Sequence, residues 1–242
     1  SFDFDMPRAI RDTYLPEDFS QVTLYTDRED LFPGYQPRKK LAARELSDPP
    51  PVSLISTTYN EAESVADWFE CILKQSLPPA EIVIVDANSS DGTVAELKSF
   101  QDESSIPIRV IKKGKINIAR GRNAAIEAAR HDLIAVSDFG CRPREDWLKK
   151  LVAPFQDDPD LEVAAGWYQA VDDRGRRVPY EVGPDLDEVS PQTFLPSSRS
   201  VAFTREAWKK AEGYPAWMTL TGEDTYFALE LKRHAARWAF VP

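Results

Sequence analysis

VSLISTTYNE, at residues 52–61, begins the part of the sequence that decides the fold. Its first seven residues are mostly apolar or β-branched, which predicts a buried strand over 52–58. Apolar residues at helical spacing over 62–75 then predict a helix. IVIVDANSSDGT, at 82–93, repeats the arrangement, because a β-branched strand leads into a loop rich in residues that cap helices, and a helix from about Val94 follows.

The alternation of strand, polar loop and helix continues beyond these two units. The next expected elements are a strand, a helix and a strand over 108–111, 119–129 and 133–137. Such alternation predicts an α/β fold with a Rossmann-like, mostly parallel sheet and helices on both faces. Ligands of these sheets bind outside the carboxyl ends of the strands. We therefore expect a nucleotide site at 57–61, 86–91 and Asp138, where polar residues end three strands.

The second half of the chain is expected to pack onto the first half. Its predicted elements are a helix from Trp147 to about 155, strands near 163–170 and 201–203, and helices over 206–212 and 225–236. Residues 1–48 show no sustained periodicity and precede three prolines, so we interpret them as an extension or linker that packs on the domain or tethers it. The remaining residues, 49–242, are predicted to form one domain, with nucleotide bound by 52–141.

Composition excludes several classes of function. The chain has 242 residues, of which 42% are hydrophobic, and a formal charge of -10, which argues against a nonspecific nucleic-acid partner. Two cysteines, Cys71 and Cys141, and two histidines give no disulfide framework and no Cys/His zinc motif. The apolar runs are too short to span a membrane. We expect membrane contact through segments outside this sequence.

Five segments of the chain resemble, in order and spacing, the motifs of family 2 glycosyltransferases, which have the GT-A fold. They are VSLISTTYNE (52–61), IVIVDANSSDGT (82–93), ARGRNAAIEAA (119–129), LIAVSDFGC (133–141) and GEDTYF (222–227). The resemblance implies an inverting enzyme that transfers a sugar from a nucleoside diphosphate sugar to a hydroxyl of a glycan or lipid-linked acceptor, which 142–242 would bind. It also implies a role in making cell-surface polysaccharides or glycolipids, in the cytoplasm at the inner membrane face.

The resemblance assigns donor-binding roles to matching positions. The implied base and ribose pocket consists of Thr58, Tyr59, Glu61 and Asp86. Arg122 would lie near the base or the diphosphate. Many family members have two adjacent acids where this chain has Asp86-Ala87, which leaves the identity of the donor base open.

The resemblance also assigns the catalytic and metal-binding carboxylates. Asp224, beside Glu223, would be the general base and would face the donor residues across a gap for the sugar. Asp138 takes the first place of the family's D-x-D motif and would touch ribose or metal, but Gly140 stands in the second. We therefore expect Mn²⁺ or Mg²⁺ to bind together with the donor, through Asp138, phosphate oxygens and water.

Three further residues, Glu223, Arg199 and Trp217, are candidates for contact with acceptor or phosphate. Arg199, in the hydroxyl-rich segment 196–200, could hold a diphosphate or an anionic acceptor, and Trp217 could stack on a sugar. Local pattern alone favours a structural role for Glu223 and Asp224, as acids at a helix N-terminus, and only the resemblance reverses that interpretation.

Two other functions stay open. A nucleotidyltransferase would be expected to have a glycine-rich loop with a cation after the first strand, and 57–61 has neither. A noncatalytic nucleotide-sugar-binding module fits the loss of acids at Ala87 and Gly140, but Asp138 and Asp224 speak against it.

Overall fold

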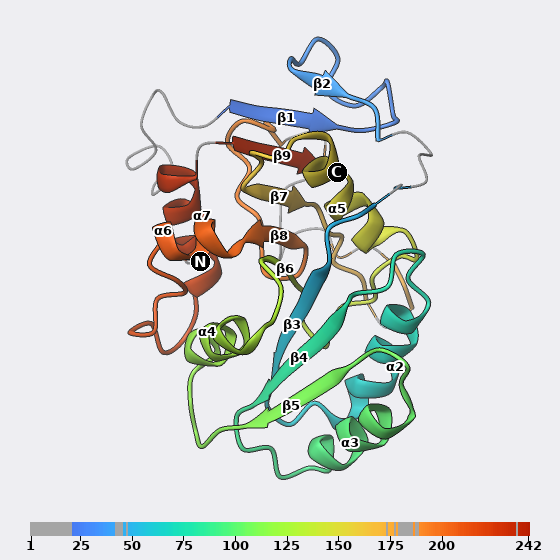
Figure 1. The fold of residues 1–242 in the computed structure, drawn as a ribbon, viewed down its shortest axis with the longest axis vertical. Coiled ribbons are helices and arrows are strands. Elements are labelled where there is room, and N and C mark those ends of the chain that lie inside the picture. The colour runs from blue at the N-terminus through green and yellow to red at the C-terminus, as the bar shows by residue number, and fades with distance from the viewer. Residues whose placement is uncertain are drawn as a thin grey trace.

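The computed structural model describes residues 21–41, 46, 48–172, 174–176, 178, 186, 189–235 and 237–242. Within them one nine-stranded sheet runs in the order β2-β1-β9-β7-β8-β6-β3-β4-β5, from the top to the bottom of Figure 1. The strands are β1 (Gln21–Tyr25), β2 (Arg38–Lys39), β3 (Val52–Thr58), β4 (Glu81–Asp86), β5 (Ile108–Lys112), β6 (Leu133–Val136), β7 (Val163–Gly166), β8 (Val201–Thr204) and β9 (Arg237–Val241).

Helices cover both faces of the sheet (Figure 1). They are α2 (Ala62–Leu73), α3 (Thr93–Glu103), α4 (Ile118–Ala128), α5 (Trp147–Asp157), α6 (Arg205–Lys210) and α7 (Glu223–His234). Apolar residues of α2, α3 and α5 share one buried cluster with one face of the strands, and those of α4, α6 and α7 share another cluster with the opposite face. The α/β fold predicted from the sequence is therefore confirmed.

The predicted nucleotide-binding half forms the parallel core of the sheet. Strand β3 pairs in parallel with both β4 and β6, and β4 pairs in parallel with β5. Strand β8 is antiparallel to β6 and β7. Most of the strands therefore end at one edge, where their carboxyl ends bring polar residues together.

Two parts of the sheet differ from the sequence prediction. Strands β1 and β2 lie in the segment interpreted as an extension, and β9 follows the last predicted helix. Strand β1 pairs in parallel with β9, with Gln21 opposite Arg237, so neighbours in the sheet come from opposite ends of the chain. Local periodicity does not show such long-range pairing. The domain limits remain a prediction, and residues 1–20 of the proposed extension lie outside the described residues.

A close approach of α4 to β3 positions the start of α4 over the carboxyl edge. Gly121 faces Thr57, and a Cβ at Gly121 would lie 2.8 Å from Thr57 Cγ2. Because glycine has no Cβ, the helix packs directly on the strand. This contact places the next residue of α4, Arg122, inside the protein at the edge of the sheet.

Gly166, the last residue of β7, tests a second close contact in the sheet, where β7 packs on α5 and on the segment before β8. An added Cβ would lie 2.1 Å from Ser200 Oγ and 3.0 Å from both Ser200 O and Leu151 Cδ2. We expect Gly166→Ala to lower the free energy of unfolding by about 1–3 kcal/mol, because atoms forced into a close-packed site displace their neighbours. Chemical denaturation measures this loss.

Gly114→Ala is the matched control, since no atom lies within 4 Å of its added Cβ and its φ is not positive. Equal stability of Gly166→Ala and Gly114→Ala would show that β7 and the segment before β8 are not packed as described.

Candidate active site

A buried arginine joins three carboxylates from two distant parts of the chain. The side chain of Arg122 is 1% exposed. Its Nη2 lies 2.9 Å from Asp138 Oδ1, after β6, while its Nη1 lies 2.9 Å from Glu223 Oε1 and 2.5 Å from Asp224 Oδ1, in the first turn of α7. The structure therefore brings four of the predicted site residues together. A buried guanidinium would be costly without such partners, so the four groups stabilise one another's charges.

The position of Arg122 differs from the one expected of a cation near a base or diphosphate. Both of its Nη groups donate to carboxylates, and Nε has no hydrogen-bond partner among the described residues. The guanidinium also lies 5.3 Å from the centre of the Tyr214 ring, which stacks in turn on Phe227. Arg122 thus organises carboxylates below the surface of the site.

Asp224 is enclosed by hydrogen-bond donors. Its Oδ1 accepts from Arg122 and from Ser198 Oγ at 2.7 Å, and its Oδ2 accepts from Ser197 Oγ at 3.0 Å and from Ser198 N at 3.1 Å. Burial disfavours its charged form, but Arg122 and the serine hydrogen bonds outweigh burial and hold the pKa of Asp224 below its ordinary value. The carboxylate is therefore ionised at neutral pH. The expected gap between Asp138 and Asp224 is replaced by this shared guanidinium.

The predicted donor pocket lies at the ends of β3 and β4. Thr58 and Asp86 are direct neighbours across these two parallel strands, and both are buried. Asp86 accepts hydrogen bonds from Asn88 N and Ser89 N at 3.2 Å, so its carboxylate holds the following loop. Tyr59 is exposed, and Glu61 is half-buried at the start of α2. The predicted residues thus form two sets, this one and the cluster around Arg122.

Asp138 has one oxygen available for a ligand. Its Oδ1 bonds to Arg122, whereas no described residue donates to its Oδ2. A Cβ added at Gly140 would meet no atom within 4 Å, so the position of the second D-x-D acid is open space. No group of three or more His, Cys, Asp or Glu side chains in the described part of the chain could hold a metal ion. These residues fit a divalent ion only where donor oxygens supply most of its ligands.

Burial makes Cys141, close to Asp138 in the sequence, unsuitable as a nucleophile. Burial and the charge of Asp138 raise the pKa of its thiol to about 11. The thiol therefore stays neutral at physiological pH.

Arg199 and Trp217, the candidates for substrate contact outside the cluster, each contact a neighbour of Asp224. Arg199 is half-buried, donates to Ser197 Oγ at 3.1 Å and lies over the ring of Tyr168. Trp217 is 68% exposed and makes an edge-to-face contact with Tyr226, in α7. One cation and one aromatic ring are therefore available near Asp224.

Three residues of the cluster's surroundings were not assigned from the sequence: Ser197, Ser198 and Tyr214. Ser197 and Ser198 belong to the hydroxyl-rich segment noted for Arg199, which was their only signal. Tyr214 has no signal in the sequence, because its position is set by Asn123, whose side chain bonds to both backbone polar groups of Tyr214 at 2.9 Å. Such a contact becomes visible only in three dimensions.

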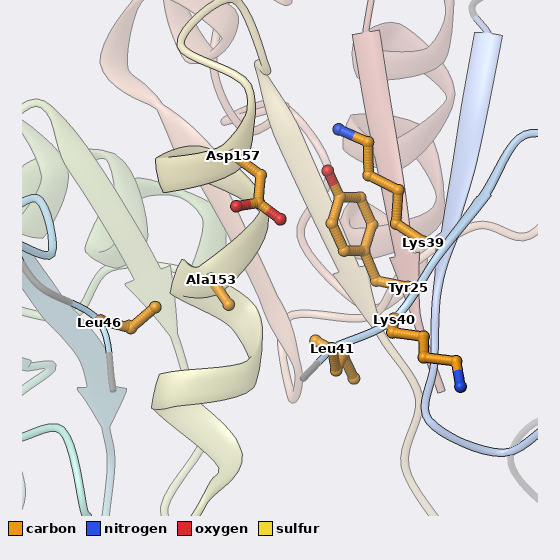
Figure 2. Close-up of a pocket in the computed structure, with 7 residues that line it drawn as sticks. All are labelled: Tyr25, Lys39, Lys40, Leu41, Leu46, Ala153 and Asp157. Carbon is orange, nitrogen blue, oxygen red and sulfur yellow. The ribbon is translucent and has the colours of Figure 1, made fainter. Parts of the chain in front are cut away.

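A hollow of about 440 Å³ lies away from these residues. Tyr25, Lys39, Lys40, Leu41, Leu46, Ala153 and Asp157 line it, between α5 and the strands β1 and β2 (Figure 2). None of the predicted site residues is among them. Among the described residues, no helix is both long and apolar enough to cross a membrane.

Solved structures share the fold of this chain. A mannosyltransferase from Pyrobaculum calidifontis, in complex with GDP-Man and Mn²⁺, superposes with a TM-score of 0.65 at 21% identity, over 81% of this chain and 55% of the other. S. aureus TarS, in complex with UDP-GlcNAc, superposes with a TM-score of 0.64 at 20% identity, over 78% of this chain and 55% of the other. These likenesses establish the GT-A type of fold.

Sequence similarity to a curated protein and to a described family gives further evidence on the family of this chain. The hyaluronan synthase of Pasteurella multocida is 22% identical over 160 residues, which are 66% of this chain and 16% of that protein. The chain therefore spans only a small part of this relative. Residues 53–210, more than half of the chain, match the family described as Glycosyl transferase family 2. The chain belongs to glycosyl transferase family 2.

Proposed function

We propose that the chain is the donor-binding and catalytic part of an inverting glycosyltransferase, which transfers a sugar from a nucleoside diphosphate sugar to an acceptor hydroxyl. The observation that carries the proposal is the joining of Asp138 to Glu223 and Asp224 through Arg122. The carboxylates come from both halves of the chain, and Arg122 follows Gly121, which packs on Thr57 next to the end of β3. Two structures of the same fold hold GDP-Man and UDP-GlcNAc, which supports a nucleotide-sugar donor.

Asp224 is proposed as the general base. Its carboxylate is ionised, so it can accept the proton of the acceptor hydroxyl while the acceptor oxygen forms a bond to the anomeric carbon. The bond between that carbon and the diphosphate oxygen breaks on the opposite side, and its electron pair leaves with the diphosphate. One displacement of this kind inverts the configuration. Arg199 is proposed to stabilise charge on the departing diphosphate.

Asp138 is proposed to hold a divalent cation when the donor is present. Arg122 bonds to Oδ1 of Asp138, and no described residue donates a hydrogen bond to its Oδ2. Bound Mn²⁺ or Mg²⁺ would supply positive charge to the leaving diphosphate. A Mn²⁺ ion in the mannosyltransferase structure supports this assignment.

The acceptor is proposed to approach past Trp217, at the inner face of a membrane. Asn117 donates to Ala216 O and Met218 O at 2.8 and 2.9 Å, and thus ties the loop of Trp217 to the start of α4. Exposed apolar side chains there are Ile118, Trp217, Leu220 and Tyr226. Residues 112–122 and 213–222 contain four exposed cations, Lys112, Lys113, Lys115 and Arg120, and no acid, although the chain carries a charge of -10. Apolar side chains beside exposed lysines suit an anionic lipid surface.

The role of Asp224 is tested by Asp224→Asn. We expect turnover to fall by about 10²–10⁴-fold, the usual contribution of a general base, because an amide cannot take the proton. Release of nucleoside diphosphate measures turnover. The control Glu206→Gln removes an exposed carboxylate of α6 and leaves turnover unchanged.

Three other outcomes of this assay would contradict the proposal. Turnover in Asp224→Asn at the level of the control would exclude Asp224 as the base. Release of pyrophosphate would indicate a nucleotidyltransferase. Nucleotide binding without turnover of any donor would indicate a binding module.

Dependence of metal binding on the donor is tested by thermal unfolding with UDP, GDP or ADP, with and without Mn²⁺. We expect one nucleotide with Mn²⁺ at about 100 times its Kd to stabilise the protein by about 2.7 kcal/mol, a shift in Tm of roughly 5–10 °C. We expect Mn²⁺ alone to cause no shift, because Asp138 offers one free oxygen. Gly140→Asp adds a second carboxylate and should respond to Mn²⁺ alone. Full stabilisation of the unaltered protein by Mn²⁺ alone would contradict a donor-dependent site.

Membrane contact is tested by comparing binding to two kinds of vesicle. One contains about 30% phosphatidylserine, whose negative charge attracts lysines, and the other is neutral. We expect binding to the anionic vesicles only, and an approximately tenfold or greater loss of binding in a Lys113→Gln, Lys115→Gln variant, since each lysine contributes about 1 kcal/mol near such a surface. Leu220→Ala should also weaken binding. Leu73→Ala, which removes an exposed leucine of α2, should not. Equal binding of both vesicle types would overturn the assignment of this surface.

A further inference from the structure

The loop before α7 folds back on the start of that helix. A Cβ added at Gly222, the N-cap of α7, would lie 3.2 Å from Met218 Cε, so Met218 packs against the helix start. The ring of Trp217 contacts Tyr226, in the first turn of α7, with its centre 5.4 Å from the centre of the Tyr226 ring. Trp217 is therefore held beside the helix turn that carries Asp224.

The side chain of Asn117, the N-cap of α4, holds the backbone on both sides of Trp217. Its Nδ2 donates to Ala216 O at 2.8 Å and to Met218 O at 2.9 Å. Its Oδ1 accepts from Arg120 N at 2.9 Å and so caps the helix. Because an amide nitrogen carries two hydrogens, both donors of the side chain are used. Asn117 thus has two separate tasks, one in α4 and one in the loop before α7.

The helix that Asn117 caps is fixed to the donor side of the site. Gly121 packs on Thr57 of β3, and Arg122 bonds to Asp138. These two contacts restrict movement of the first turns of α4. The amide of Asn117 therefore fixes the loop before α7 relative to the residues that are proposed to bind the donor.

We propose that Asn117 is a positioning residue that places Trp217 for an acceptor whose terminal unit is a sugar ring. The Trp217 ring is 68% exposed, and an aromatic ring can stack on the apolar face of a sugar. The hydroxyl of a sugar bound in this way competes with water for the anomeric carbon of the donor. In both reactions the bond to the diphosphate breaks and the proton goes to Asp224. A fixed Trp217 thus favours transfer to the sugar over hydrolysis of the donor. This inference rests on the proposed function.

Two substitutions separate the tasks of Asn117. Serine and aspartate cap helices about as well as asparagine, so Asn117→Ser and Asn117→Asp keep the cap of α4. Serine cannot donate to both loop carbonyls, and an aspartate carboxylate cannot donate to either. We expect the KM for acceptor to rise about tenfold in Asn117→Ser and further in Asn117→Asp, whose charge faces the two carbonyls. Hydrolysis of the donor should stay within about twofold of the unaltered protein, because the contacts of Arg122 are kept.

The assay uses the nucleotide sugar that the protein hydrolyses. Methyl glycosides of glucose, galactose, mannose and N-acetylglucosamine serve as acceptors. Glycoside product measures transfer, and release of nucleoside diphosphate without a glycoside measures hydrolysis. Thr204→Ser is the matched control, because it exchanges the N-cap residue of α6 for another good cap and should change neither rate.

A double variant tests whether Asn117 acts through Trp217. We expect Trp217→Ala to raise the KM for acceptor about tenfold, since it removes the stacking ring. Asn117→Ser should add nothing to the effect of Trp217→Ala, because the loop then has no ring to position. Additive effects in the double variant would overturn the inference.

Other outcomes would also contradict the inference. An unchanged KM for acceptor in both Asn117 variants would show that the residue is only a helix cap. Equal loss of hydrolysis and transfer in Asn117→Ser would show a general structural role. Hydrolysis by the unaltered protein without transfer to any of the four glycosides would refute a sugar acceptor and leave the proposed function standing. If the unaltered protein turns over no donor, the proposed function fails, and the inference fails with it.

Discussion

The ion-pair cluster centred on Arg122 is the interaction on which the site depends. One guanidinium, almost fully buried, bonds to carboxylates that follow β6 and begin α7. Without the cation, three carboxylates would be crowded together at a partly buried site and would repel one another. Without the carboxylates, the cation would be buried alone. Neither half of the chain can therefore hold these groups in place by itself, and the cluster couples the packing of the two halves.

The surrounding packing is arranged to deliver Arg122 to that position. Gly121 lets α4 approach Thr57 of β3, and Asn123 fixes the backbone of Tyr214 on the opposite side of the helix start. Three consecutive residues of α4 thus have three different tasks: close approach, charge and connection to the loop before α7. The aromatic ring of Tyr214 then closes one side of the guanidinium.

Asp224 and Asp138 differ in the number of hydrogen bonds that their carboxylates receive. Asp224 receives four hydrogen bonds and stays ionised, while Asp138 keeps one oxygen without a donor among the described residues. The carboxylate of Asp224 is therefore held in one orientation, whereas that of Asp138 is held through one oxygen alone among the described residues. The same cation therefore bonds to two carboxylates in different hydrogen-bonding environments.

The sequence by itself determined the α/β fold, the parallel core strands and the identity of the acidic residues at strand and helix ends. These features follow from periodicity and local spacing, which act over a few residues. Only the tertiary structure decided the pairing of β1 with β9, the burial of Arg122 and the donors around Asp224. The partners in these contacts lie far apart in the sequence, as Arg122 and Asp224 do by 102 positions. Their meeting depends on how helices and strands pack, and no local pattern encodes that geometry.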